Sequence, residues 1–260
     1  MLELQNLSFS YPGVDVLRRV SFMLPRPELV ALFGPNGSGK TTIYRCILKS
    51  LAYSGSIFLD GEDISKLSTQ SIARRVAYVP QEHEPPFPYR VLDMVLMGRT
   101  PHLGGIFGPA ERDRHRASEA LRQVGIEDLS ERAYTRLSGG QRQLVLLSRA
   151  LSQDAELLLL DEPAASLDFG NQLLLWRTIH ELSRKGKSIL ICTHDPNHVL
   201  WFCDRVIVLG RDGAVVADGT PHQVITPTLV RDLYGSECAI ATTHGRQVAV
   251  PPACPVRVCS

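Results

Sequence analysis

The sequence has no excess of charge of either sign. Its 260 residues include 28 Lys and Arg against 27 Asp and Glu, which gives a formal net charge of +1. No basic face dominates, which argues against a protein that binds nucleic acid by neutralising phosphates, and we expect no nucleic-acid partner. Long apolar runs are also missing, because none approaches the roughly 20 residues that a membrane-spanning helix needs. Any role at a membrane is therefore expected to depend on a partner protein.

The cysteines follow no common metal-binding pattern. Their spacing fits no usual zinc motif, and the six are Cys46, Cys192, Cys203, Cys238, Cys254 and Cys259. The first two lie among apolar residues, which predicts small buried side chains, whereas the last two lie in a proline-rich tail. Residues 1–10 alternate between apolar and polar side chains, as a strand does, so we expect no signal peptide there.

The sequence does contain a regular alternation of strand and helix patterns. Apolar runs at 29–33, 157–160 and 188–193 are typical of strands that are covered on both faces. Helical patterns separate them, which predicts an α/β fold with a mainly parallel sheet and helices on both faces. In such sheets, ligands bind beyond the carboxyl ends of the strands.

We expect most of the chain to form a single domain. This domain covers residues 1–235 and includes a mainly helical insertion at about 82–136, where Pro and Gly first interrupt the pattern and a helical periodicity follows. Residues 236–260 form a C-terminal tail whose role the sequence does not indicate. The tail is open to two interpretations, a disordered segment or a small pair of strands.

A glycine-rich loop follows the apolar strand at 29–33 and opens a helix. Its residues are Gly34, Pro35, Asn36, Gly37, Ser38, Gly39, Lys40, Thr41 and Thr42. They fit the P-loop pattern, in which glycines let the backbone curl so that its N–H groups point inward and make an anion site. Lys40 is predicted to reach the β- and γ-phosphates of a nucleotide, and the Thr41 hydroxyl to bind Mg²⁺.

Two acids and a histidine follow the other two apolar strands. Asp161 is expected to orient Mg²⁺ through its water shell, and Glu162 to accept a proton from the attacking water. His194 ends the next strand, where it is placed to contact the γ-phosphate. The alternatives are a pair of solvated acids and a structural histidine. The P-loop in the same chain favours the catalytic interpretation.

A second anion site is indicated at the start of another helix. Ser138 is a plausible N-cap, and Gly139 and Gly140 leave the helix start bare ahead of Gln141. One nucleotide is already assigned to the first loop, so physical reasoning alone favours an ordinary capped helix here.

The segment 137–141, Leu-Ser-Gly-Gly-Gln, resembles the signature of the ABC ATPases, because it stands between a P-loop and an Asp-Glu-Pro strand end. The resemblance spans about residues 2–234. It includes Tyr11, Gln81, the triplet 166–168 and His194. It implies a P-loop NTPase of ABC type, with an antiparallel β subdomain and a helical subdomain beside the core sheet. The implied cofactors are ATP and Mg²⁺.

The resemblance also implies roles for single residues. Tyr11 stacks on adenine, and Gln81 contacts Mg²⁺ or the attacking water and reports the nucleotide state to a membrane partner. Ser138, with Gly140 and Gln141, clamps ATP held by a second copy of the chain, while Asp168 signals between the copies. A homodimer thus explains two anion sites in one chain.

The chain has no membrane span of its own, no second P-loop and no coiled-coil insertion. These features favour the ATPase subunit of a bacterial importer, bound to permease subunits at the cytoplasmic face of the inner membrane. A periplasmic or surface substrate-binding protein would complete the system.

Residues 79–83, 91–102 and 168–172 resemble the ATPases that import iron–siderophore, haem or cobalamin chelates. Molybdate importers share these features, and a soluble DNA-repair or translation ATPase is a further alternative.

The segment 90–99 is predicted to line the groove that receives a permease helix, with Met94 and Met97 exposed. The alternative is an ordinary amphipathic helix that packs inward.

Overall fold

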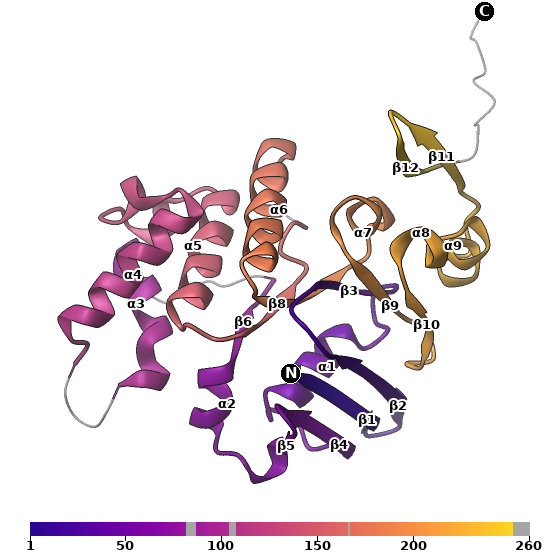
Figure 1. The fold of residues 1–260 in the computed structure, drawn as a ribbon, viewed down its shortest axis with the longest axis horizontal. Coiled ribbons are helices and arrows are strands. Elements are labelled where there is room, and N and C mark those ends of the chain that lie inside the picture. The colour runs from indigo at the N-terminus through magenta and orange to yellow at the C-terminus, as the bar shows by residue number, and fades with distance from the viewer. Residues whose placement is uncertain (82–86, 104–107, 166, 252–260) are drawn as a thin grey trace, which may run out of the picture.

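The computed structural model describes residues 1–81, 87–103, 108–165 and 167–251 (Figure 1). The strands are β1 (Leu2–Tyr11), β2 (Val14–Leu24), β3 (Leu29–Phe33), β4 (Ser54–Leu59), β5 (Glu62–Asp63), β6 (Val76–Val79), β7 (Leu157–Asp161), β8 (Ser188–Thr193), β9 (Arg205–Leu209), β10 (Val215–Gly219), β11 (Ala239–Thr243) and β12 (Arg246–Val250). The α-helices are α1 (Lys40–Ile47), α2 (Thr69–Arg75), α3 (Val91–Leu96), α4 (Glu111–Val124), α5 (Gly139–Ser152), α6 (Phe169–Arg184), α7 (Pro196–Phe202), α8 (Pro221–Val224) and α9 (Pro227–Tyr234). Short 3₁₀ turns lie at η1 (Ile64–Lys66), η2 (Met97–His102), η3 (Glu127–Leu129) and η4 (Tyr134–Arg136).

The core sheet is mainly parallel, as the alternation of strands and helices predicts. Its order within the described residues is β10-β9-β3-β8-β7-β6, and only β10 runs antiparallel to its neighbour. Every residue of β3 and β7 is buried. These strands are apolar throughout because both faces of the sheet are covered.

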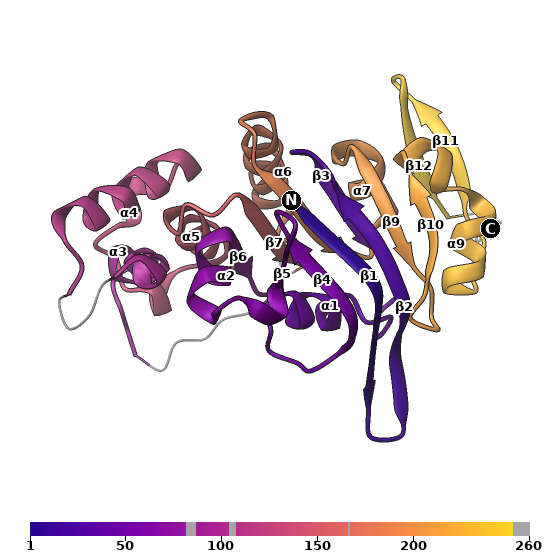
Figure 2. The ribbon, with the colours of Figure 1, turned by 60° about the horizontal axis from the view of Figure 1, so that its bottom comes forward.

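Alternate side chains of each strand enter two separate cores. Ala31 and Leu158 point into one core, which helices α4 to α7 cover. Their neighbours Leu32 and Leu159 point into the other, together with α1 and the strands of the antiparallel sheet β2-β1-β4-β5. Helix α1 therefore lies between the two sheets (Figure 2). The predicted fold class, with its antiparallel and helical subdomains, is confirmed.

The helices between β6 and β7 gather at one end of the molecule (Figure 1). A buried ion pair links them, since Arg99 Nε donates to Asp113 Oδ1 at 3.0 Å and Arg99 Nη1 donates to the Ser152 carbonyl at 2.7 Å. Only 10% of the Arg99 side chain and 3% of the Asp113 side chain are exposed. This pair fixes η2 and α4 on the end of α5.

The prediction that Met94 is exposed is wrong. Helix α3 packs against α4 and α5, and this contact buries Met94 completely. Met97 lies one turn further on and is 40% exposed, as predicted. The alternation of buried and exposed positions is that of an amphipathic helix, and from sequence its inner and outer methionines could not be distinguished.

The described part of the tail forms a hairpin of β11 and β12, one of the two interpretations of this segment. Its strand β12 contacts α7. Cys46 and Cys192 are buried, as predicted, and neither forms a disulfide. Cys254 and Cys259 lie outside the described residues.

None of the helices in the described ranges combines the length and apolar character that crossing a membrane requires.

The Arg99–Asp113 pair gives a stability prediction. Asp113→Ala leaves a buried guanidinium without its carboxylate, and we expect the free energy of unfolding to fall by about 3 kcal/mol in urea titrations. The matched control is Glu127→Ala, which breaks an exposed pair with Arg122 at 2.8 Å and is expected to lower the free energy of unfolding much less, because solvent screens this pair. Equal losses in the two variants would contradict the structural role of the buried pair.

Candidate nucleotide site

The glycine-rich loop joins β3 to α1 at the carboxyl edge of the core sheet. Gly37 and Gly39 have φ angles of +82° and +98°, in the left-handed region where only glycine is unstrained. A Cβ on Gly39 would also lie 2.6 Å from Leu17 Cδ2. Gly39 caps α1 without a side chain of its own, so the backbone N–H groups of the first helical turn remain available to an anion.

Lys40 is the first residue of α1, and its side chain turns back into this loop. It is 5% exposed, and its Nζ donates to the carbonyl oxygens of Gly34 and Pro35 at 2.8 and 3.0 Å. Glu162 Oε1 lies 3.6 Å from the same nitrogen. The loop thus holds a buried positive charge beside backbone donors, the arrangement that binds phosphate.

Asp161 ends β7 and is almost fully buried. Tyr78, from the neighbouring strand β6, donates its hydroxyl to Asp161 Oδ2 at 3.2 Å. Burial raises the pKa of the Asp161 carboxyl, while hydrogen bonds with Thr41 and Tyr78 oppose the rise and the charge of Glu162 adds to it. The contact with Thr41 brings together the two residues that the sequence assigns to Mg²⁺.

Glu162 leaves the strand with a φ of +45° and donates its backbone N–H to the Cys192 carbonyl at 3.2 Å. Its side chain is 13% exposed, and Oε2 lies 3.0 Å from His194 Nδ1. The structure therefore joins Lys40, Glu162 and His194 in one chain of contacts. A carboxylate held between a cation and an imidazole is placed to accept a proton from water.

Sequence reasoning missed the residue that holds His194 in position. Tyr234, at the end of α9, donates its hydroxyl to the His194 carbonyl at 3.2 Å, and its ring packs on Phe33 at the end of β3. No local pattern connects positions 40 residues apart, so only the fold reveals this contact. Tyr78 was missed for the same reason, since a tyrosine within an apolar strand gives no signal of its partner.

Tyr11 and Gln81 are exposed at strand ends. Tyr11 ends β1, 41% exposed, and its ring meets Phe9 edge to face. Gln81 lies two residues beyond β6, which is the neighbour of β7 in the sheet. Gln81 therefore leaves the sheet at the edge where Glu162 and His194 lie.

The signature segment opens α5 with a capping box. Ser138 Oγ accepts from the Gln141 N–H at 3.3 Å, and Gln141 Oε1 accepts from the Ser138 N–H at 3.1 Å. Gly140 packs so closely on α6 that a Cβ would lie 2.7 Å from the Asn171 side chain. Asp168 holds this asparagine through bonds of 2.9 and 2.8 Å to its N–H and its Nδ2.

The structure thus brings the signature start and Asp168 together through Asn171, a contact that the sequence resemblance of 168–172 did not indicate. Among the described residues, no hydrogen bond or ion pair joins Ser138 to the glycine-rich loop or to Glu162. The two predicted anion sites are therefore separate within one chain.

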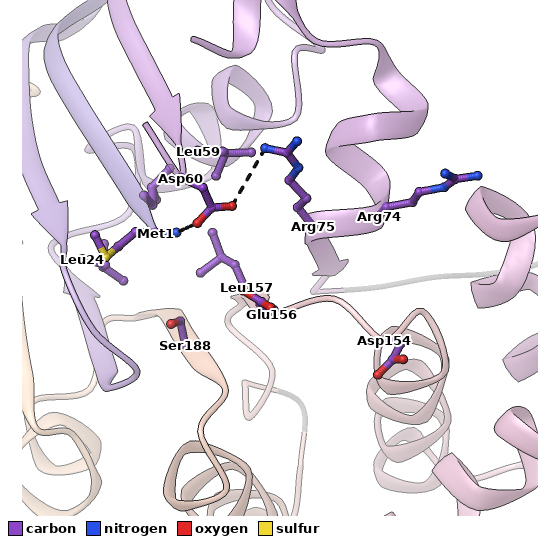
Figure 3. A pocket seen from close by; sticks show the side chains of 11 residues that line it. Met1, Leu24, Leu59, Asp60, Arg74, Arg75, Asp154, Glu156, Leu157 and Ser188 are labelled. Atoms are coloured by element: carbon purple, nitrogen blue, oxygen red, sulfur yellow. Dashed lines mark hydrogen bonds and ion pairs between the residues drawn. The ribbon is translucent and has the colours of Figure 1, made fainter. Parts of the chain in front are cut away.

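A cavity of about 290 Å³ lies at the other end of the core sheet (Figure 3). It is lined by Leu157 and Ser188, the first residues of β7 and β8. Its Asp60 pairs with the Met1 ammonium and lies 3.9 Å from Arg75. These charges neutralise one another at the edge opposite the glycine-rich loop, so we do not assign the nucleotide to this cavity.

Comparisons with known proteins find similar sequences and folds over most of the chain. A family model described as ABC transporter matches residues 17–165. An uncharacterised ABC transporter ATP-binding protein of Haemophilus influenzae is 39% identical, over 81% of this chain and 81% of its own. The iron(3+)-hydroxamate import ATP-binding protein FhuC of Bacillus subtilis is 35% identical, over 93% of this chain and 90% of its own.

A solved structure has the same fold over nearly the full length. It is described as an inward-facing conformation of a metal-chelate type ABC transporter, and it superposes with a TM-score of 0.84 at 28% identity. The match covers 96% of this chain and 95% of that one.

The contacts of Glu162 give a kinetic prediction. Glu162→Gln keeps the size of the side chain but removes the proton acceptor, and we expect ATP turnover to fall by about 10²–10⁴-fold with ATP affinity nearly unchanged. Equilibrium binding of a fluorescent ATP analogue and phosphate release measure the two quantities. Glu156→Gln, an exposed glutamate just before the opposite end of β7, is the matched control and should leave both unchanged. Parallel loss of binding and turnover in Glu162→Gln would contradict the assignment.

Proposed function

The chain belongs to the ABC transporter family, and from this membership we propose that it is the ATP-hydrolysing subunit of a metal-chelate importer that works as a homodimer. The observation that carries the proposal is the contact of the buried Lys40 ammonium with Glu162 and of Glu162 with His194. Lys40 opens the helix that follows β3, whereas Glu162 and His194 directly follow β7 and β8, and these three strands are adjacent in the sheet. They combine a phosphate-binding cation with a proton acceptor.

ATP is proposed to bind with its phosphates on the glycine-rich loop and its adenine on the exposed ring of Tyr11. Lys40 neutralises the β- and γ-phosphates, while backbone N–H groups of the loop and of the α1 start donate to their oxygens.

Mg²⁺ fits the oxygen donors of Thr41, Asp161 and Gln81, which would hold it together with phosphates and water. No group of three or more His, Cys, Asp and Glu in the described chain could hold a metal alone, and Mg²⁺ in nucleotide sites does not require one. When bound there, Mg²⁺ would neutralise part of the negative charge of the phosphates.

Hydrolysis is assigned to Glu162 and His194. Glu162 accepts a proton from the attacking water, and His194 contacts the terminal phosphate and reports its loss. Tyr234 supports this step by holding the His194 carbonyl. Only 13% of the Glu162 side chain is exposed, so few bulk water molecules can hydrogen-bond to its carboxylate in place of the attacking water.

A second copy of the chain is proposed to complete each site. At the α5 start, Ser138 and Gly139 are exposed while Gly140 is buried, and the side chains of Ser138 and Gln141 are occupied by each other's backbone N–H groups rather than by the chain's own glycine-rich loop. A two-fold dimer places this helix start over the nucleotide of the partner. Asn171 and Asp168 link that start to the loop after Glu162, which connects one site with the other.

The membrane partner is proposed to dock beside Gln81. Phe87 and Met97, both within the segment that follows β6, are 60% and 40% exposed, and apolar side chains at a surface favour protein contact. The chain would then lie on the cytoplasmic face of a bacterial inner membrane, bound to permease subunits. A substrate-binding protein outside the membrane would deliver the substrate.

The substrate class rests on the motif resemblance of 91–102 and 168–172 and on the iron(3+)-hydroxamate relative. Iron–siderophore, haem or cobalamin chelates are the proposed cargo, and molybdate is the alternative within the same subgroup. A soluble DNA-repair or translation ATPase is less well supported, since the chain has balanced charge.

The dimer proposal predicts that a substitution can prevent dimer formation without preventing ATP binding. In a Glu162→Gln background, Mg-ATP should shift the chain from monomer to dimer in sedimentation velocity. Adding Ser138→Arg should keep it monomeric while ATP binding persists, because in the described residues Ser138 makes its side-chain hydrogen bonds with Gln141 and not with its own phosphate loop. Ser65→Arg, at an exposed serine of η1, is the control and should still dimerise. A Ser138→Arg monomer that loses ATP would place the signature on its own nucleotide and refute the proposal.

The transport proposal predicts a response to cargo. With permease and binding protein reconstituted in lipid vesicles, ATP turnover should rise several-fold with a ferric hydroxamate, haem or cobalamin. Molybdate and a Glu162→Gln complex serve as comparison and control. A response to molybdate alone would move the chain to the alternative substrate class, and stimulation by DNA or ribosomes without any chelate response would refute transport.

A further inference from the structure

A groove of about 560 Å³ lies above α7, between α6 and the β11–β12 hairpin. Both views of the ribbon show this hairpin and α6 on opposite sides of α7 (Figures 1 and 2). One face of α6 forms the first wall, since its lining residues recur at helical spacing from Phe169 to His180. We refer to this space as the hairpin groove, and its volume lies in the range of small-molecule sites.

The second wall is held firmly on α7. The Asn197 side chain imitates a strand partner, because its Nδ2 donates to the Ala249 carbonyl and its Oδ1 accepts from the Ala249 N–H, at 3.2 and 2.8 Å. Trp201 Nε1 donates to the Gln247 carbonyl at 3.0 Å. The hairpin groove therefore exists as a built feature between two fixed walls.

The lining of the hairpin groove is mainly apolar, its polar members are two arginines, two histidines and a threonine, and its described residues include no acid. Phe169 and Trp201 are 72% and 36% exposed, and Val248 adds an aliphatic surface. Arg177 and Arg246 line the same space, and no Asp or Glu is among the described residues that do so. Neither arginine has an ion-pair partner in the described ranges. Unpaired guanidinium groups beside exposed aromatic rings are complementary to an anion with a flat apolar body.

We propose that the hairpin groove is a binding site for a small aromatic organic anion, such as an aryl carboxylate or sulfonate. Its acidic group is bound by Arg177 and Arg246, and its ring packs on Phe169 and Trp201. This site is separate from the nucleotide site, whose positive charge is the buried Lys40.

The position of the hairpin groove links it to hydrolysis. Its wall α6 begins directly after Asp168, and its floor α7 begins after His194 and Asp195. A ligand that bridges α6, α7 and β12 would restrain both loops, and we expect it to change ATP turnover. This regulatory part rests on the proposed function, whereas binding itself does not.

The test titrates the full-length chain, without nucleotide, with 8-anilinonaphthalene-1-sulfonate. Probe fluorescence and quenching of Trp201 should both report one saturable site, and the chain has only one other tryptophan, the buried Trp176. The double variant Arg177→Gln/Arg246→Gln should bind about tenfold more weakly. Arg184→Gln, on the same helix but outside the groove, should bind like the unmodified chain. The uncharged analogue N-phenyl-1-naphthylamine should bind about tenfold more weakly than the sulfonate.

Unchanged affinity in the double variant, with melting and circular dichroism like those of the unmodified chain, would overturn the proposal. So would non-saturable binding or equal affinity for the uncharged analogue. If the double substitution instead abolishes Mg-ATP-dependent dimerisation in a Glu162→Gln background, the hairpin groove is an interface between copies and the ligand proposal fails. If ATP turnover does not change at a saturating concentration of the probe, the regulatory part of the proposal is wrong. This outcome does not depend on whether the chain hydrolyses ATP for transport.

Discussion

The parallel register of the core strands places the functional groups. Phe33 pairs with Thr193, and Asp161 pairs with Cys192, so β3, β7 and β8 end side by side. The next residue of each strand, Gly34, Glu162 or His194, must then begin a loop at the same edge. A shift of one residue would move every core side chain to the other face of the sheet. The two hydrophobic cores therefore hold the site in register.

The parts that could be predicted from sequence are those with a local physical signature. Fully apolar strands, glycines at positive φ and a serine N-cap each depend on neighbours within a few residues. Met94 shows where this reasoning fails, because periodicity identifies an amphipathic helix but not which face meets α4 and α5. The contacts of Tyr78, Tyr234 and Asn171 could not be found, since the partners of these residues lie far away in the chain or depend on how two helices cross.

The electrostatic design of the site separates two acids that are adjacent in sequence. Asp161 is buried, and burial raises the pKa of its carboxyl against the opposing hydrogen bonds from Thr41 and Tyr78. Glu162 turns away at positive φ and meets Lys40 and His194 instead. Two neighbouring carboxylates thus enter different environments because the backbone reverses between them, and this difference supports the separate roles proposed for them at the metal and at the attacking water.

The close approach of Gly140 to Asn171 has a mechanical consequence. A methyl group on Gly140 would lie 2.7 Å from the Asn171 side chain, so a larger residue there would have to displace Asn171 from its bonds with Asp168. The start of α5 and the residue that caps α6 are therefore linked through a single side chain, that of Asn171.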